Sequence, residues 1–234
     1  ITGNKYPGTN VEVIAVSKEH SPHLKNTDFR AWMHMSIVTN STLMYSPARK
    51  SLPGHKHIQL LDFNTSALSK AEVERIDDSV GFTPDYKYRM IVINGDFETR
   101  LDKTVSILRK LYIKEHMYNI VIKPDVTYIL PSKIVGRMLD ARVFIGIVST
   151  TDKNLFEDIK NKINKGEGSK IITDYSDCNY EENELIDLVK ETPIKIPKIE
   201  DTKDRLSILG ANLGAVLALG DNNIVPGLNL ANGL

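Results

Sequence analysis

The sequence predicts a layered α/β domain in which helices flank a mostly parallel or mixed β-sheet, with a more β-rich portion at the N-terminus. Two observations predict this class. Short apolar runs alternate with longer segments whose apolar residues recur at helical spacing through residues 88–173. The chain has 234 residues, of which 41% are hydrophobic, and this is enough to bury one large core. We therefore expect a β-rich N-terminal portion or subdomain over residues 1–84, an α/β core over 85–220 and an apolar tail over 221–234.

The N-terminal portion is expected to contribute strands. Residues 11–16 and 57–63 are mostly apolar runs of strand length. Residues 29–45 alternate in a way that predicts a hairpin turning at Asn40-Ser41, and a short helix over residues 29–35 is the rival interpretation.

The second half of the chain carries clearer signals. Ser69 and Glu72 have the spacing of a capping box, which predicts a short helix ending near Ser79. Beyond it, strands are expected at 88–93, 119–122, 126–130, 143–148 and 170–173, and helices at 97–116, 132–139, 152–164 and 180–190.

Charge and cysteine content narrow the classes of function. Lys+Arg and Asp+Glu both number 30, so no global charge draws the chain to nucleic acid or to an anionic membrane. The lone cysteine, Cys178, excludes an internal disulfide and a cysteine-based zinc site, and it favours a reducing compartment or a virion. Because the chain begins with Ile1 and not Met, we expect a segment to precede it in the intact protein.

An uncharged segment lies near the C-terminus. Residues 206–220 carry no charge, but fifteen residues fall short of the roughly 20 that span a bilayer, so no transmembrane segment is expected. Gly210, Gly214 and Ala218 recur every four residues and leave one helix face nearly bare. Such a face packs closely on the chain's own sheet, on another subunit or against a membrane, and we assign it as a candidate interaction surface.

A phosphate site is predicted after the strand at 143–148. Ser149, Thr150 and Thr151 lie between that strand and the next helix, where free amides and hydroxyls suit a phosphate group. Capping of the helix is the alternative role of these residues.

A magnesium site is predicted from three acids. Asp96, Asp152 and Asp174 each lie near the end of a predicted strand, where carboxylates can bind Mg²⁺. Ordinary turn and capping roles are the alternative.

Two further groups of residues carry weaker signals. The closely spaced histidines would suit zinc or proton transfer if they met, and surface loop positions are the alternative. The basic loop at 49–57 would suit a phosphate backbone, although it lacks the aromatic residues of single-strand binders. The histidines are His20, His23, His34, His55 and His57, and the basic residues of the loop are Arg49, Lys50 and Lys56.

The leading functional hypothesis is a non-catalytic structural or assembly subunit. No strong catalytic motif is present, the net charge is zero and the C-terminal segment is uncharged. Such a subunit would act through contacts with other subunits of a homo- or hetero-oligomer, in a viral, phage or secretion-type assembly. The first alternative is a Mg²⁺-dependent α/β enzyme that handles nucleotides or phosphate. The second alternative is a nucleic-acid-binding module that uses the basic loop.

Overall fold

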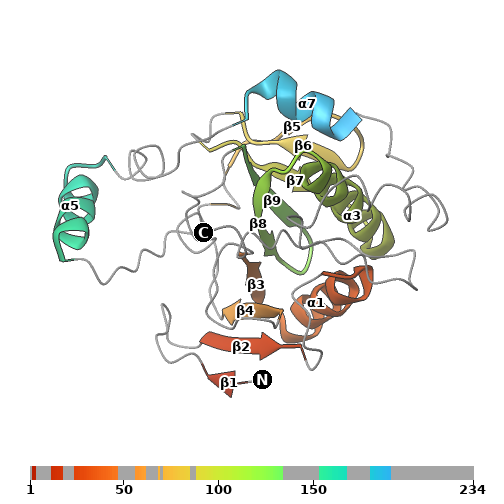
Figure 1. Ribbon diagram of the computed structural model, residues 1–234, viewed down its shortest axis with the longest axis horizontal. Helices are drawn as coiled ribbons and strands as arrows, with labels where there is room; N and C mark the ends of the chain where they lie inside the picture. Colours follow the sequence, from red (N-terminus) through yellow and green to blue (C-terminus); the bar gives the residue numbers. More distant parts are fainter. Residues whose placement is uncertain are drawn as a thin grey trace, which may run out of the picture.

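In the part of the chain that the structure describes, nine strands form one antiparallel sheet in the order β1-β2-β4-β3-β8-β9-β7-β6-β5 (Figure 1). The computed structural model describes residues 2–3, 12–17, 24–46, 56–61, 68, 71–84, 88–133, 153–167 and 180–190. The strands are β1 (Thr2–Gly3), β2 (Glu12–Val16), β3 (Thr42–Tyr45), β4 (His57–Leu61), β5 (Glu74–Arg75), β6 (Val80–Phe82), β7 (Ile91–Ile93), β8 (Met117–Ile122) and β9 (Thr127–Ser132). The helices are α1 (Asn26–Thr39), α3 (Phe97–Ile113), α5 (Lys153–Asn164) and α7 (Glu182–Lys190).

The expected mostly parallel or mixed sheet is wrong, because every strand pair in the described sheet is antiparallel. The order strand–helix–strand does occur, as β7-α3-β8. However, a turn at 123–126 folds β9 back against β8, and β9 then lies between β8 and β7. The helix therefore connects two strands that are not neighbours, and the pattern of a βαβ unit arises without a parallel pair.

A helix replaces the predicted hairpin at residues 29–45. α1 covers residues 26–39, and its buried residues Phe29, Trp32, Met33 and Ser36 lie at helical spacing. Asn40 ends the helix in the left-handed conformation with φ of 49°. The alternation in this segment did not indicate a strand, because odd- and even-numbered positions both contain apolar residues. The helical spacing of the buried residues, with a period of 3.6, is the pattern that matches the structure.

Of the other predicted elements, several are confirmed, one is wrong and others lie outside the described residues. The structure confirms strands at 12–16, 57–61, 119–122 and 127–130, and helices at 97–113, 153–164 and 182–190. The predicted helix ending near residue 79 is wrong, because the described residues 71–80 hold bends and β5. The predicted strands at 143–148 and 170–173 lie outside the described residues.

The main core lies between one face of the sheet and three helices. Apolar side chains of α1, α3 and α7 join those of the sheet in one cluster, among them Leu43, Ile58, Ile120 and Ile129 at 0% exposure. We call this the helix face of the sheet, and the opposite face the distal face. The sheet takes strands from both sides of residue 84, so the expected N-terminal portion and the α/β core share this one core.

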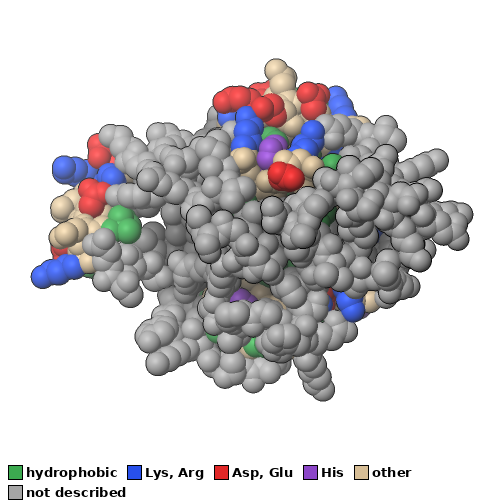
Figure 2. Space-filling model, viewed as in Figure 1, with side chains coloured by type: hydrophobic (Ala, Val, Ile, Leu, Met, Phe, Trp, Pro, Cys, Tyr) green, Lys and Arg blue, Asp and Glu red, His purple; other side chains and the backbone are tan. Residues whose placement is uncertain are grey.

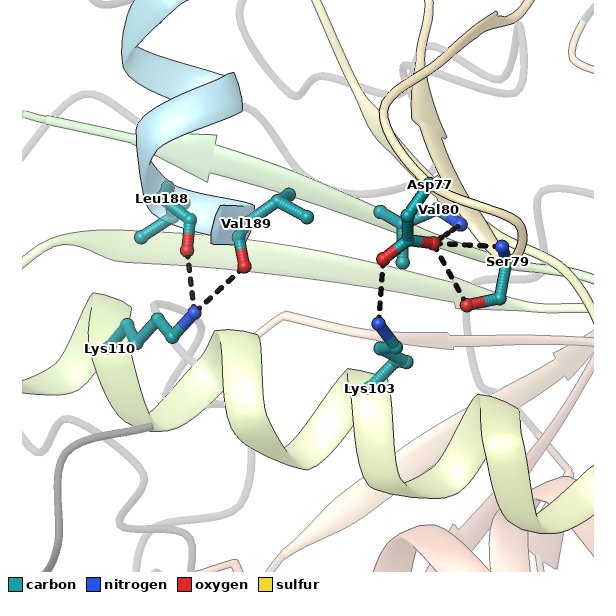
Figure 3. Close-up of polar contacts among 7 residues, drawn as sticks. All are labelled: Asp77, Ser79, Val80, Lys103, Lys110, Leu188 and Val189. Carbon is teal, nitrogen blue, oxygen red and sulfur yellow. Dashed lines mark hydrogen bonds and ion pairs between the residues drawn. The ribbon is translucent and has the colours of Figure 1, made fainter. Parts of the chain in front are cut away.

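Two lysines of α3 tie the helix to neighbouring elements (Figure 3). The Lys110 ammonium is buried and donates to the carbonyls of Leu188 and Val189, at 2.9 and 3.0 Å, near the C-terminal end of α7. Positive charge is favourable at that end of a helix. Lys103, about two turns earlier on the same side of α3, donates to Asp77 Oδ2 at 2.6 Å, in the turn between β5 and β6. α3 is thus fastened to both α7 and the sheet edge.

The ionised Asp77 carboxylate stabilises the fold, and we expect this stabilisation to be lost in acid. Burial alone would raise the pKa of Asp77, but bonds from Lys103, Ser79 and Val80 lower it to about 2. The pKa of Asp77 in the folded protein lies below the unfolded value, which is near 4. Asp77 therefore makes its full contribution to the free energy of unfolding above about pH 4, and this contribution disappears as the pH falls toward 2. The Lys103–Asp77 pair is 40% and 37% exposed, so solvent screening reduces the contribution to about 1 kcal/mol.

We therefore expect Asp77→Asn to lower the free energy of unfolding by about 1 kcal/mol at pH 7 and by almost nothing near pH 2. Urea unfolding at a series of pH values measures this difference. Asp78→Asn, at the exposed neighbouring residue, is the matched control and should leave the pH dependence unchanged. A constant difference between Asp77→Asn and wild type across the pH range would contradict the assignment.

Charged side chains of both signs gather over α7 (Figure 2). Lys133 forms an ion pair with Glu184, and its ammonium lies 5.4 Å from the centre of the Tyr180 ring. The Tyr180 hydroxyl bonds to Nδ1 of His116, and burial together with Lys114 and Lys133 lowers the pKa of that histidine. These contacts hold the start of α7 on the end of α3.

Among the described helices, none is both long enough and apolar enough to cross a membrane.

Candidate active site

β4 separates apolar side chains from polar ones. Successive side chains of a strand point to opposite faces of the sheet. Ile58 and Leu60 belong to the core on the helix face, so His57 and Gln59 point to the distal face. Both polar side chains are half-buried, whereas Ile58 is fully buried. β4 therefore presents an imidazole and a carboxamide side by side on one face.

The strand register fixes the neighbours of this pair. On β2, Val16 lies opposite His57 and Ile14 lies opposite Gln59. On β3, Met44 lies opposite Gln59. Directly opposite residues of an antiparallel pair share a face of the sheet, so these three apolar side chains flank the two polar ones on the distal face. The imidazole and the carboxamide thus lie on an otherwise apolar stretch of sheet.

A second apolar cluster continues the distal face beyond Met44. Within it, the Tyr88 hydroxyl donates to the Pro131 carbonyl at 2.7 Å, and burial raises the pKa of Tyr128 to about 12. The Tyr88 hydroxyl thus has the hydrogen-bond partner that a buried polar group requires. The cluster consists of Met44, Leu61, Leu68, Tyr88, Met90, Val92, Val121, Val126, Tyr128 and Leu130.

The chemistry of His57 and Gln59 suits a phosphate ester. Imidazole is the side chain that most readily exchanges a proton near neutral pH, and it can also attack phosphorus as a nucleophile. A carboxamide N–H donates to phosphate oxygens. In the described residues, no group of three or more His, Cys, Asp or Glu side chains is close enough to hold a metal ion. The imidazole itself offers acid–base or nucleophilic chemistry beside the carboxamide donor.

Asp96 is the one predicted metal ligand that the structure describes. It is the N-cap of α3, and its Oδ1 accepts from the Thr99 amide at 2.7 Å. The Thr99 amide and hydroxyl hold the pKa of Asp96 below its ordinary value. The observed role is thus the capping role that was the alternative. The remaining predicted site residues lie outside the described residues, namely Asp152, Asp174, Ser149, Thr150, Thr151, Gly210, Gly214 and Ala218.

The histidines are not brought together where the structure describes them. His34 lies on α1, which packs on the helix face, and its ring stacks on Phe97 with 4.4 Å between ring centres. His57 points to the distal face, so these two imidazoles lie on opposite sides of the sheet. His20, His23 and His55 lie outside the described residues.

The basic loop also differs from its expected form. Lys56 is 3% exposed, and its ammonium forms an ion pair with Asp28 at 2.8 Å on the helix face. Residues 49–55 of the proposed nucleic-acid contact lie outside the described residues. Gln59 was missed altogether. Its signal in the sequence is the spacing His57-x-Gln59 within an apolar strand, where a polar residue at every second position marks one face.

The class that the fold defines is an α+β protein built on one antiparallel sheet, with α1, α3 and α7 packed on a single face. No protein family model matches the chain. No curated protein matches it in sequence either.

Solved structures of yeast Ap4A phosphorylase Apa2 are similar to this chain. The complex with Ap4A has a TM-score of 0.56 at 11% sequence identity, and the complex with AMP has 0.54 at 12%. Each similarity covers 76% of this chain and 73% of the phosphorylase chain. At this level of identity, the likeness shows that the two proteins share a fold.

The likeness corrects the leading functional hypothesis. A non-catalytic structural or virion subunit was expected, whereas the solved structures that share the fold belong to a phosphorylase with bound adenine nucleotides. The second alternative, a nucleic-acid-binding module, loses Lys56 from its contact surface because that side chain is buried.

Proposed function

We propose that this chain is an enzyme that acts on the phosphate chain of an adenine nucleotide, with His57 and Gln59 at its centre. The observation that carries the proposal is the placement of these two side chains together on the distal face of β4. The shared fold supports it, because the similar structures are those of a phosphorylase solved with AMP and with Ap4A. Both ligands contain an adenosine joined to phosphate, and this defines the substrate class.

The two side chains would divide the chemistry. His57 would attack the phosphorus nearest the adenosine, or protonate the phosphate oxygen that leaves. Gln59 would donate an N–H to a non-bridging oxygen of the same phosphate and so stabilise the charge that develops there. If His57 attacks, the P–N bond forms as the bond to the bridging oxygen breaks, and an oxygen of inorganic phosphate then displaces the imidazole from that phosphorus. If His57 acts as an acid, the phosphate oxygen displaces the bridging oxygen directly. Applied to Ap4A, this exchange yields ADP and ATP.

The sites predicted from the sequence enter this proposal as further ligands. Asp152 and Asp174, with or without Asp96, would hold Mg²⁺ against the phosphate chain, and Ser149 to Thr151 would donate to it. Self-association through Gly210, Gly214 and Ala218 stays a separate prediction. An assay with added Mg²⁺ and one with EDTA distinguish a metal-dependent from a metal-independent reaction.

The test is to measure nucleotide binding and turnover by the wild-type chain. We expect AMP and Ap4A to raise the melting temperature, because a ligand at 100 times its Kd stabilises a folded protein by about 2.7 kcal/mol. We also expect Ap4A and inorganic phosphate together to yield ADP and ATP, separated by ion-exchange chromatography. Millimolar AMP and Ap4A that neither shift the melting temperature nor react would overturn the proposal.

A further inference from the structure

Lys56 and His57 are adjacent in the chain but lie on opposite faces of the sheet. The backbone carbonyl of Lys56 accepts from the Ser17 amide at 2.8 Å, which continues the β2–β4 pairing by one residue. Lys56 therefore has the geometry of a strand residue, and its side chain leaves the strand toward the helix face. His57 leaves the next position toward the distal face. Any shift of the backbone at Lys56 is transmitted directly to the imidazole.

The Lys56 side chain ends in a buried ion pair. Its exposed fraction is 2%, that of Asp28 is 19%, and the ammonium lies 2.8 Å from Asp28 Oδ2. The same oxygen accepts the Lys25 backbone amide at 2.6 Å, so Asp28 also fixes the first turn of α1. One carboxylate thus joins the start of α1 to the start of β4.

Apolar packing alone would tolerate small movements at this point. Ile58 and Leu60 select the face on which β4 packs, but apolar contacts are non-directional. A charge-assisted hydrogen bond is short and directional. A lysine ammonium is almost never fully buried unless it is paired, as Lys56 is with Asp28. The pair lies one residue before His57, which is where a directional restraint has the largest effect on that side chain.

We propose that the Lys56–Asp28 ion pair positions His57. It holds the backbone at the start of β4 against α1, and so holds the imidazole in the orientation that the reaction requires. Lys56 and Asp28 are positioning residues that act from the helix face, without contact with the substrate. The inference rests on the proposed function for its catalytic consequence, but the orientation of the imidazole can be measured without any substrate.

The first measurement is kinetic. We expect Lys56→Met and Asp28→Asn to lower kcat about 10- to 100-fold with KM changed less than about threefold, because a displacement of about 1 Å costs about that factor in rate. Lys56→Arg keeps the ion pair and should recover most of the rate. Lys103→Met is the matched control, since it breaks another Lys–Asp pair, at the opposite edge of the sheet. It should leave both constants unchanged.

The second measurement reads His57 directly. The chain has six histidines, and the ring signals of His57 in a ¹H–¹³C spectrum are assigned by their loss in His57→Asn. We expect Lys56→Met and Asp28→Asn to move these signals, and Lys103→Met to leave them in place. If Asp28→Asn does not fold, Lys56→Met decides, because it removes the buried ammonium and leaves the Asp28 carboxylate, whose side chain is 19% exposed.

The outcomes separate the two proposals. A wild-type chain without nucleotide binding or turnover refutes the proposed function, while the His57 signals still decide whether the ion pair positions the ring. A folded Lys56→Met or Asp28→Asn with wild-type kcat and unmoved His57 signals overturns the positioning role. An equal loss of rate in Lys103→Met would also overturn it, because the effect would then follow from general destabilisation.

Discussion

Replacing His57 with asparagine is expected to lower kcat at least about a thousandfold, which is the range lost when a proton-transferring or nucleophilic imidazole is removed. Asparagine retains a polar side chain of similar length and can still hydrogen-bond. His57 is half-buried on the distal face, so the melting temperature should stay within about 2 °C of wild type. Initial rates with Ap4A and phosphate, together with a thermal melt, give both numbers.

Two further variants provide a control for His57→Asn and a test of Gln59. His34→Asn is the matched control, because that exposed histidine lies on α1 and packs on Phe97. It should keep the wild-type kcat. Gln59→Leu removes the N–H donor but leaves the imidazole, and we expect it to reduce kcat/KM about 10- to 100-fold. A chain with His57→Asn that turns over at the wild-type rate would exclude His57 as the reacting group.

Arg100→Ala is expected to have the largest effect on stability, a loss of about 3 kcal/mol in the free energy of unfolding. Arg100 is 2% exposed, and its guanidinium donates to the carbonyls of Lys123 and Pro124 at 3.0 and 2.8 Å. Both carbonyls lie in the turn between β8 and β9. Truncation removes both donors from these half-buried residues and also opens a cavity beneath α3. For a domain of this size, the melting temperature should fall by about 6–12 °C.

A graded series tests the bidentate contact. Arg100→Lys keeps the charge but offers one amine in place of a planar fork, so its loss should lie between wild type and Arg100→Ala. Arg75→Ala removes an exposed arginine from the edge strand β5 and should shift the melting temperature by less than about 2 °C. Equal melting temperatures for Arg100→Ala and Arg75→Ala would show that the contacts to the turn contribute nothing.

Local elements were predictable because their signals are local. α3 shows its apolar residues Leu101, Val105 and Leu108 at helical spacing, and each of them is buried as expected. The break between β8 and β9 was expected, because Lys123-Pro124-Asp125 divides the two predicted strands. Strand order has no such signal. Whether β7 pairs with β8 or with β9 depends on contacts between distant residues, and the sequence pattern does not encode them.

The candidate site was predicted only in part, for a related reason. His57 stood out as one of several histidines, and it was placed where the basic loop meets the strand expected at 57–63. Gln59 was missed because an isolated polar residue in a strand usually marks only a face that touches water. The burial of Ile58 and Leu60 under the helices reveals which face His57 and Gln59 share, and that is a tertiary fact. Lys56 looked like a surface charge because its partner lies 28 residues earlier in the chain.

The pairing of β3 with β8 has a consequence for how the protein is made. Leu43 pairs with Ile122, so the inner edge of β3 has no partner until residue 122 has left the ribosome. During that interval, the newly made N-terminal strands offer unsatisfied amides and carbonyls next to apolar side chains, which is the kind of surface that aggregates or recruits chaperones. Folding should therefore be slow and completed late, with β9, which lies between β8 and β7, as the strand that completes the sheet.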